Sequence, residues 1–348
     1  MELSLRTVRE VMGLDPDIRL GLVLERATRR DHRLGGTVCS LAAAEGHRLG
    51  TLGNALLEVE RARRDEHERL RALVCEEVRA HVLKGAALQA YYPPGVLRAS
   101  RDVDLLVPDE DDLWAAVAAV ARERPVDEAR VSMLESGGRR HWAVALNWPS
   151  PESDLDPVYA AEFLSAPFVG NSTTVPLRTE WPANPVVAHL LLIAEELFQQ
   201  PLRGRDVVDI AVLTHAMTER DVSDLHRAAG HWMLAPEVRE ALIRVNAVPG
   251  LSTVTSRTLA RDLGAAAERE LARRAAAAGS GDGTAAVVHY GFSLGPALSS
   301  PTLVVERDAD MTVVRCPVGG YLMVDTLSVP LELARAALDR HPGAILPG

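Results

Sequence analysis

The chain has 348 residues, of which 47% are hydrophobic and 25% are charged, so its composition is that of a folded globular protein and not of a disordered, collagen-like or coiled-coil chain. Its 48 acidic and 38 basic residues give a formal net charge of -10, which argues against broad binding to a nucleic-acid backbone because such binding depends on Lys and Arg. Aromatic residues make up 4%, too few to favour a surface that stacks bases.

The three cysteines, Cys39, Cys75 and Cys316, lie far apart and are odd in number. This spacing predicts reduced thiols rather than a disulfide framework or a cysteine zinc site. Residues 1–13 lack the apolar run of a signal peptide, and no segment approaches the roughly 20 apolar residues of a membrane span. We therefore expect a cytoplasmic protein with no membrane partner.

Residues 1–80 are predicted to form an N-terminal helical segment. Apolar residues between 52 and 81 recur at helical spacing and alternate with dense charge, which predicts one long amphipathic helix. The charged run at 61–71, RARRDEHERLR, is interpreted as the solvated face of this helix, supported by i,i+4 pairs.

Residues 81–180 are predicted to form a core of mixed strands and helices. Apolar runs and their Pro and Gly breakers predict strands at 81–83, 103–107 and 142–148, and helices at 86–92 and 112–124. Residues 149–180 are expected to be rich in loops, with one strand near 173–177.

The remainder of the chain divides by composition into two further regions. Residues 181–278 are predicted to form a helical domain, with helices at 185–198, 205–218, 221–229, 236–245 and 256–278. Glycine-rich residues 279–283 are expected to be a flexible linker to a small antiparallel β appendage and terminal helix at 284–348. The predicted fold class is α+β, with a mixed-sheet core, flanking helical regions and this appendage.

Two short motifs in the core suggest chemistry. The first strand ends at Lys84-Gly85 before a helix, whose first backbone N–H groups can bind phosphate. Asp102 and Asp104 stand at i and i+2 of the next strand and therefore point to the same face. Two such carboxylates can bind one hard cation, and Mg²⁺ prefers one or two carboxylates together with phosphate oxygens. A D-x-D pair also occurs by chance, and the alternative is a strand edge paired with nearby arginines.

The order of these motifs resembles the nucleotidyltransferase-fold superfamily related to DNA polymerase beta, in particular a branch of bacterial nucleotidyltransferases often found in biosynthetic clusters. The resemblance covers about residues 50–220 and includes a later helix with Asp206 and Asp209. The matching positions in the motif are Lys84, Gly85, Tyr92, Pro93, Arg98, Asp102 and Asp104.

The resemblance implies a nucleotidyltransferase that uses Mg²⁺ to move a nucleoside monophosphate from an NTP, expected to be ATP, to a small-molecule or peptide acceptor. Asp102 and Asp104 would bind the metal and act as catalytic residues. Lys84 and the amides after Gly85 would hold phosphates, Arg98 would contact a phosphate or orient an aspartate, and Ser100 would belong to the nucleotide site. The net charge makes a nucleic-acid acceptor, including tRNA, a disfavoured alternative.

The sequence departs from the superfamily pattern at a third carboxylate on a later strand. In this branch that strand commonly ends in an Asp-x-His-Trp-like motif, but here Ala145 and Asn147 occupy the positions of the acid and the histidine. Either another residue replaces the acid, or the fold is retained for binding as a catalytically degenerate scaffold protein. The acids considered as replacements are Glu135, Glu152, Asp154 and Asp156.

Overall fold

The computed structural model describes the chain except for residues 1–2, 30–31, 152–153, 157, 281–285, 309, 342 and 346–348. The chain divides into two compact units, and each is assembled from three separate segments. Unit 1 contains Met1–Asp65, Lys84–Ser100 and Glu180–Gly283, and unit 2 contains Glu66–Leu83, Arg101–Thr179 and Thr284–Gly348. The predicted division into four consecutive domains stays a prediction.

Unit 1 is helical in its described residues. Its elements are α1 (Leu5–Val11), α2 (Leu20–Thr28), α3 (Gly35–Ala44), the first part of α4 (Thr51–Glu77), a 3₁₀ helix (Gly85–Tyr91), α6 (Pro185–Glu195), α7 (Gly204–Ala216), α8 (Glu219–His231), α9 (Ala235–Asn246), α10 (Val254–Asp262) and α11 (Gly264–Ser280). A short 3₁₀ turn at Glu196–Phe198 follows α6. Among the described residues, no helix combines the length and apolar character needed to cross a bilayer.

The helices of unit 1 begin where the sequence supplies caps. Asn184 caps α6 and is followed by Pro185 in the first turn, while Thr218 and Thr253 form capping boxes at α8 and α10. The core of the unit contains α6 and α7, which both pack against α9. Fully buried residues on α6 and α7 include Leu190, Leu191, Val208, Ile210 and Leu213.

One helix predicted in this unit is two helices in the structure. The chain leaves α10 at Leu263 and begins α11 at Gly264, so the predicted helix 256–278 is interrupted. Glycine costs about 1 kcal/mol relative to alanine inside a helix, which makes it a natural point of interruption. Residues 281–283 of the predicted linker lie outside the described part of the chain.

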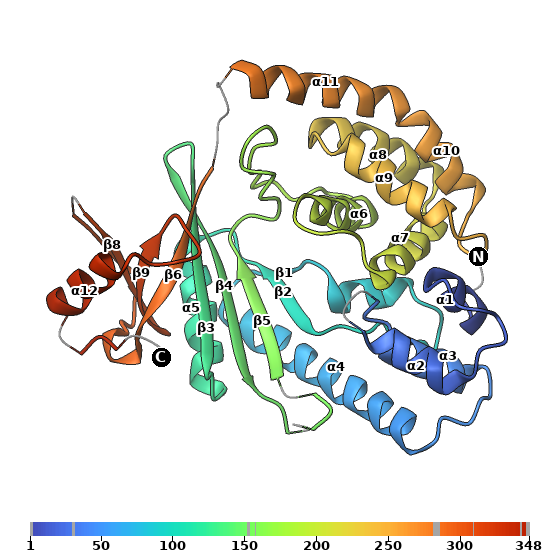
Figure 1. The fold of residues 1–348 in the computed structure, drawn as a ribbon, viewed down its shortest axis with the longest axis horizontal. Helices are drawn as coiled ribbons and strands as arrows, with labels where there is room; N and C mark the ends of the chain where they lie inside the picture. The colour runs from blue at the N-terminus through green and yellow to red at the C-terminus, as the bar shows by residue number, and fades with distance from the viewer. Residues whose placement is uncertain are drawn as a thin grey trace. The chain divides into compact units, whose positions relative to one another are not determined.

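Unit 2 is built on a nine-stranded sheet with the strand order β1-β2-β5-β4-β3-β6-β9-β8-β7 (Figure 1). Among the described residues, β2 and β5 pair in parallel, and the other neighbouring strands pair antiparallel. The strands are β1 (His81–Val82), β2 (Asp102–Leu106), β3 (Glu128–Ser136), β4 (Arg139–Pro149), β5 (Val158–Leu164), β6 (Val287–Gly295), β7 (Val304–Arg307), β8 (Thr312–Cys316) and β9 (Gly319–Val324). The protein is thus of mixed α and β structure, as predicted.

The C-terminal strands continue the same sheet as the core strands. β6 pairs with β3 from Ser132 opposite Tyr290 to Glu135 opposite Val287. The predicted antiparallel strands are present at 287–324, and α12 (Leu331–Arg340) packs its Ala337 into their small apolar cluster. What was expected as an appendage is therefore hydrogen-bonded directly to the strands before it.

One expectation for residues 149–180 was wrong, and one strand was not predicted. The described residues of this segment are mostly loop, as expected, but they include the unpredicted seven-residue strand β5. The strand expected near 173–177 is absent, and an isolated bridge joins Phe168 to Arg178. The β5 sequence VYAAEFL contains two alanines and a glutamate, which have low strand propensity. Its position between β2 and β4 overrides that local preference.

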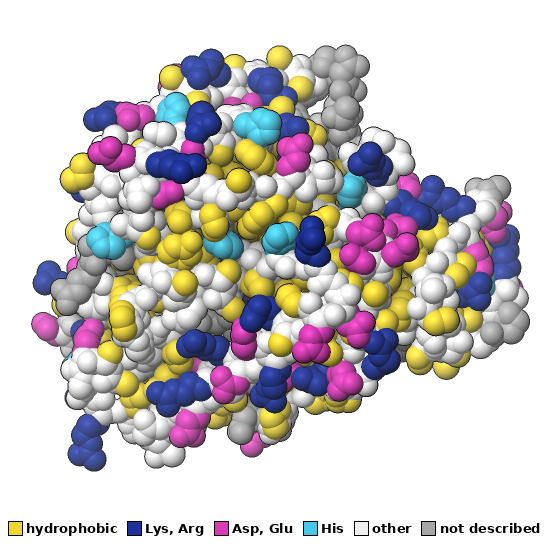
Figure 2. All heavy atoms as spheres, turned by 180° about the vertical axis from the view of Figure 1, so that it is seen from behind, with side chains coloured by type: hydrophobic (Ala, Val, Ile, Leu, Met, Phe, Trp, Pro, Cys, Tyr) yellow, Lys and Arg dark blue, Asp and Glu magenta, His cyan; other side chains and the backbone are white. Residues whose placement is uncertain are grey.

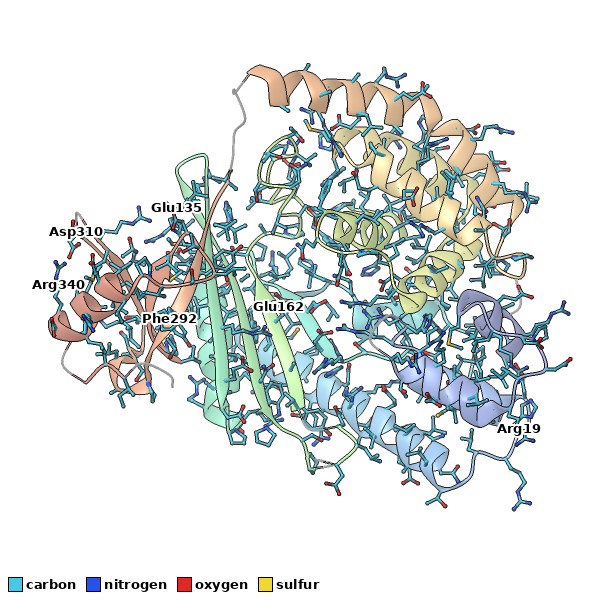
Figure 3. The ribbon with its side chains drawn as sticks, in the orientation of Figure 1. Arg19, Glu135, Glu162, Phe292, Asp310 and Arg340 are labelled. Carbon is cyan, nitrogen blue, oxygen red and sulfur yellow. The ribbon has the colours of Figure 1, made fainter. Side chains whose placement is uncertain are left out.

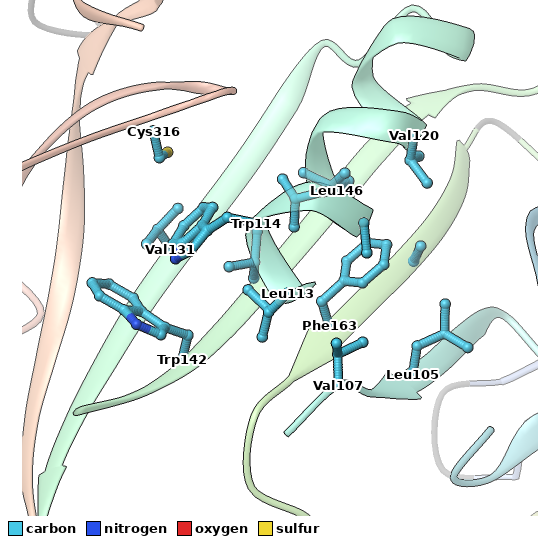
Figure 4. Close-up of a cluster of buried hydrophobic side chains, with 14 of the residues drawn as sticks. Leu105, Val107, Leu113, Trp114, Val120, Val131, Trp142, Leu146, Phe163 and Cys316 are labelled. Carbon is cyan, nitrogen blue, oxygen red and sulfur yellow. The ribbon is translucent and has the colours of Figure 1, made fainter. Parts of the chain in front are cut away.

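One face of the sheet is covered by α5 (Glu110–Glu123), which Figure 4 shows, and Leu70 and Val74 in the last turns of α4 belong to the same buried cluster. Trp114 of α5 meets Trp142 of β4 edge to face, with 5.3 Å between ring centroids. The start of α5 is fixed by the Asp109 cap and by Trp142 Nε1, which donates to Glu110 Oε2 at 2.6 Å. Buried members of this cluster include Val103, Leu105, Leu113, Val117, Val131, Val144, Leu146 and Phe163.

Candidate functional site

The two aspartates of the predicted motif lie on β2 in unit 2. Asp102 and Asp104 alternate with Val103 and Leu105, which are buried in the core against α5. Both carboxylates therefore lie on the opposite face of the sheet, where their residues are only partly buried. The backbone of β2 is tied to the preceding strand because Leu83 N–H donates to the carbonyl of Asp104 at 2.9 Å.

A third carboxylate stands beside this pair on the neighbouring strand. In the parallel pairing of β2 and β5, Asp104 is opposite Glu162 and Leu105 is opposite Phe163. Phe163 is fully buried in the core, so Glu162 lies on the same face as the two aspartates. Figure 3 labels Glu162 on β5. Because neighbouring strands lie about 4.8 Å apart, the backbone brings three carboxylates into one patch.

Glu162 is an acid next to the position at which Ala145 replaces the expected carboxylate. Ala145 of β4 is the partner of Glu162 on the other side of β5, so Glu162 lies between Ala145 and Asp104 in the sheet. Ala160, opposite Asp102, adds a further small side chain on this face. The acid is therefore one strand nearer to the aspartates than the resemblance implied.

Asn147, which takes the place of the expected histidine, is engaged elsewhere. Its side-chain amide donates to Glu128 Oε2 on β3 at 2.6 Å. Asn147 of β4 is the register partner of Ala160 on β5, two residues before Glu162 on that strand. The structure thus places Asn147 on the border of the acidic patch and directs its amide towards β3.

The acids considered earlier as replacements lie in other places. Glu135 is on β3, where it is bound by Arg307 and, at 3.4 Å, by His289. Burial acts to raise the pKa of Glu135, but these two partners outweigh burial and lower it. Asp154 is exposed and Asp156 is buried in the turn before β5, and Glu152 lies outside the described residues. Glu162 was missed because its strand was not predicted, and the sequence VYAAEFL has no regular alternation of polar and apolar residues that would have revealed it.

The donor set of this patch fits a hard cation. Carboxylate oxygens are the ligands that Mg²⁺ takes from proteins, usually one or two, with water and substrate completing the octahedron. Within the described residues, no group of three or more His, Cys, Asp or Glu side chains is placed so that it could hold a metal ion. Asp102, Asp104 and Glu162 therefore share a face of the sheet without forming a three-carboxylate metal site.

Lys84 and Gly85 belong to unit 1. Gly85 has φ of +59°, in the left-handed region that favours glycine, and it begins the 3₁₀ helix Gly85–Tyr91 in place of the predicted α-helix. The Lys84 ammonium donates to Glu196, at the end of α6. The predicted contacts of both residues with phosphate stay predictions.

Arg98 is buried and held by an aspartate of α7. Its Nε and Nη2 donate to the two carboxylate oxygens of Asp209 at 2.9 and 2.7 Å, and Tyr92 donates to the same carboxylate at 2.6 Å. Burial acts to lower the pKa of Arg98, but the Asp209 charge and hydrogen bonds outweigh burial and raise it. Arg98 therefore fixes a buried aspartate, and its contact with a phosphate stays a prediction.

Ser100 closes the segment of unit 1 that carries the motif. Its backbone carbonyl accepts a hydrogen bond from Arg63 Nη1 of α4 at 3.0 Å. Two earlier amides of the same segment are also anchored, since Leu97 N–H donates to Ser40 Oγ and Ala99 N–H to Thr37 Oγ1 of α3. The path from Arg98 to Ser100 is thus fixed by α3 and α4, and a role of Ser100 in nucleotide binding stays a prediction.

Comparison with known proteins adds no relative: no protein-family model, curated protein or solved structure matches the chain significantly. The likeness to nucleotidyltransferases accordingly depends on the motif between Lys84 and Asp104. The function is inferred from that motif and from the acidic patch on β2 and β5.

Proposed function

We propose that this protein is a Mg²⁺-dependent nucleotidyltransferase that moves a nucleoside monophosphate from an NTP, with ATP expected, to a small-molecule or peptide acceptor. The observation that carries the proposal is the placement of Asp102, Asp104 and Glu162 on one face of two adjacent parallel strands. The motif that resembles the nucleotidyltransferase superfamily supplies the first two of these residues, and the sheet supplies the third.

Each acid has a role that follows from its position. Asp102 and Asp104 would hold Mg²⁺, which when bound neutralises charge on the triphosphate and on the departing pyrophosphate. Glu162 would accept the proton of the acceptor hydroxyl or amine as that group attacks the α-phosphorus. The bond from the α-phosphorus to the bridging oxygen then breaks, and pyrophosphate leaves with that oxygen. Val103 and Leu105, buried behind the patch, keep the β2 carboxylates on this face.

The surface supports an acceptor smaller than a nucleic acid. Figure 2 shows Lys and Arg interspersed with Asp and Glu over the face that it draws. Combined with the net charge of -10, this mixed distribution favours a neutral or weakly charged acceptor over a phosphate backbone.

The decisive experiment measures pyrophosphate release from each NTP with Mg²⁺ and a panel of hydroxyl and amine acceptors. We expect Asp102→Asn and Asp104→Asn each to reduce kcat by at least about a hundredfold, the usual cost of removing a charge-stabilising group at a reacting centre. Asp154→Asn, in the exposed turn before β5, is the matched control and should retain wild-type activity. Unchanged NTP consumption in the Asp102→Asn, Asp104→Asn double variant would refute the proposal.

The alternative of a nucleotide-binding scaffold is favoured by one observation, the presence of Ala145 and Asn147 where the superfamily pattern has an acid and a histidine. Glu162→Gln separates the two functions. For a transferase, this variant should lose pyrophosphate release and still bind NTP and Mg²⁺ in calorimetry. Wild-type binding without release for any acceptor would instead support the scaffold.

A further inference from the structure

A cavity of about 580 Å³ lies in unit 2, beside the turn that joins β3 to β4. Its volume is within the range of about 300–1,000 Å³ that is typical of sites for small molecules. The cavity wall includes two carboxylates, three guanidinium groups and one apolar side chain from α5, β3, β4 and β7, namely Glu110, Glu135, Arg139, Arg140, Arg307 and Val305. All of these residues belong to unit 2.

The carboxylate of Glu110 has a donor on each of its oxygens. Arg140 Nη2 donates to Glu110 Oε1 at 2.9 Å, and Trp142 Nε1 donates to Oε2 at 2.6 Å. The side chains of Arg140 and Glu110 remain 38% and 33% exposed. A ligand can therefore reach this ion pair, but the carboxylate is already engaged.

The carboxylate of Glu135, which Figure 3 labels on β3, is engaged in a similar way. Arg307 of β7 donates to Glu135 Oε1, and His289 Nε2 of β6 lies 3.4 Å from Oε2. This pair joins strands that are 172 residues apart in the sequence. The two carboxylates on the wall are thus each held by a guanidinium group and by a ring N–H donor or acceptor.

The three arginines have donors that these pairs do not use. A guanidinium group carries five N–H donors, and Arg140 and Arg307 each reach a wall carboxylate through Nη2. Within the described ranges, the Arg139 side chain takes part in no hydrogen bond or ion pair. Its charge acts on the next residue but one, since burial and then Arg139 lower the pKa of His141, against the effect of Glu110.

The charges on the wall do not cancel. Three guanidinium groups face two carboxylates, which leaves one positive charge. The acids that follow on β7 and its turn are paired elsewhere, Glu306 with Arg315 and Asp308 with Arg340. The wall therefore presents a positive charge and unused N–H donors to the cavity, a combination that favours an anionic ligand.

The backbone beside the cavity is fixed by a tight hairpin. Gly137 and Gly138 have φ of +58° and +75°, the conformation that a two-residue type I′ turn requires. The turn sets Ser136 opposite Arg139 and Glu135 opposite Arg140. A Cβ at Gly138 would meet no atom within 4 Å, so the space beside this glycine is open. The arginines are thus carried on a defined support with open space next to it.

The cavity is separate from the acidic patch. Arg140 and Glu135 alternate along their strands with Trp142 and Met133, which belong to the buried cluster beneath α5. They therefore lie on the α5 face of the sheet, whereas the acidic patch lies on the opposite face. Binding in this cavity does not depend on the proposed nucleotidyl transfer.

We propose that this cavity binds the phosphate group of a small phosphomonoester, with Arg139, Arg140 and Arg307 as its donors. A phosphate group carries three acceptor oxygens that point in different directions, so it can use guanidinium groups that come from the turn, from β4 and from β7. A planar carboxylate would be satisfied by one guanidinium fork. Val305 offers an apolar surface to the carbon skeleton of the ligand.

The test is calorimetric titration of the full chain with inorganic phosphate and, separately, with glycerol 3-phosphate, both without divalent metal. Arg139→Gln and Arg307→Gln should each bind both probes on the order of tenfold more weakly, the cost of one charged hydrogen bond. Arg122→Gln, at a 63% exposed arginine near the end of α5, is the matched control and should bind as wild type. Arg139→Gln should also keep the wild-type Tm in phosphate-free buffer, because it removes no contact between described residues.

Two further comparisons locate the site and identify the ligand. Lys84→Gln, in unit 1, should bind both probes as wild type. Glycerol 3-phosphate should bind more tightly than phosphate, because its carbon skeleton adds contact with Val305. Tighter binding of free phosphate would overturn the assignment to a phosphomonoester.

The proposal fails if the wild type binds neither probe saturably. It also fails if either Arg139→Gln or Arg307→Gln binds as tightly as Arg122→Gln. Weaker binding in Lys84→Gln with wild-type binding in Arg139→Gln would place the phosphate in unit 1 and overturn the proposal as well.

Discussion

The protein contains two groups of carboxylates that differ in how their charge is accommodated. In unit 1, Asp209 is fully buried and receives hydrogen bonds from Arg98 and Tyr92. In unit 2, Asp102, Asp104 and Glu162 occupy a half-buried sheet face that is accessible to solvent. A buried carboxylate with a bidentate arginine is part of the fold, whereas the three carboxylates of the patch stay partly exposed on one face of the sheet. The residue type alone does not distinguish these two roles.

The largest expected effect on stability comes from breaking the buried group. Asp209→Ala leaves the Arg98 guanidinium buried without its counterion, so we expect a loss of about 3–5 kcal/mol in the free energy of unfolding. Urea denaturation followed by circular dichroism measures this loss. The Arg98→Met, Asp209→Leu double variant should recover part of it, because it removes both charges. A loss below 1 kcal/mol for Asp209→Ala would show that the pair is not structural.

Substitutions in the acidic patch should affect stability much less. Asp104→Asn and Glu162→Gln each remove one of three neighbouring negative charges, so we expect a change in the free energy of unfolding within about 1 kcal/mol, in either direction. The same denaturation experiment provides the comparison with Asp209→Ala. If Asp104→Asn unfolded the protein as strongly as Asp209→Ala, the patch would be part of the core structure and its catalytic role would lose its support.

The helices could be predicted from the sequence to a greater extent than the site. Apolar periodicity and caps such as Asn184 lie within a few residues of the helices that they define. The partners of Asp104 and Arg98 lie far from them in the sequence. Glu162 is placed beside Asp104 through the parallel register of β2 and β5, and Asp209 lies 111 residues from Arg98. Local propensity was also mixed in β5, where two alanines and a glutamate stand among residues that favour strands. The two aspartates were visible because both fall within a single strand, but the third acid required the sheet.

The dependence of stability on pH offers a smaller test in unit 1. The folded-state pKa of Glu196 is lowered, despite burial, by Lys84 and the two arginines near it. A lowered folded pKa contributes stability that is present above the ordinary pKa of 4.5 and lost as the pH falls through the folded value. Glu196→Gln should therefore flatten the loss of stability below pH 4.5, measured as Tm against pH. A wild-type slope in this variant would mean that Lys84 does not stabilise the carboxylate.

The smallest effect, on thiol reactivity, shows which unit opens first. Cys75 is exposed, whereas Cys39 and Cys316 are buried. Burial, and to a lesser extent the charge of Glu60, raises the pKa of Cys39 to about 11. Burial raises the pKa of Cys316 to about 12. A disulfide reagent at pH 8 should therefore label Cys75 rapidly, and Cys75→Ser should remove this rapid phase of labelling.

In the Cys75→Ser background, Cys39 reports opening of unit 1 and Cys316 reports opening of unit 2. Asp209→Ala should speed the labelling of Cys39, while Asp104→Asn should leave both rates unchanged. Faster labelling of Cys316 alone in Asp209→Ala would contradict the assignment of the buried pair to the stability of unit 1.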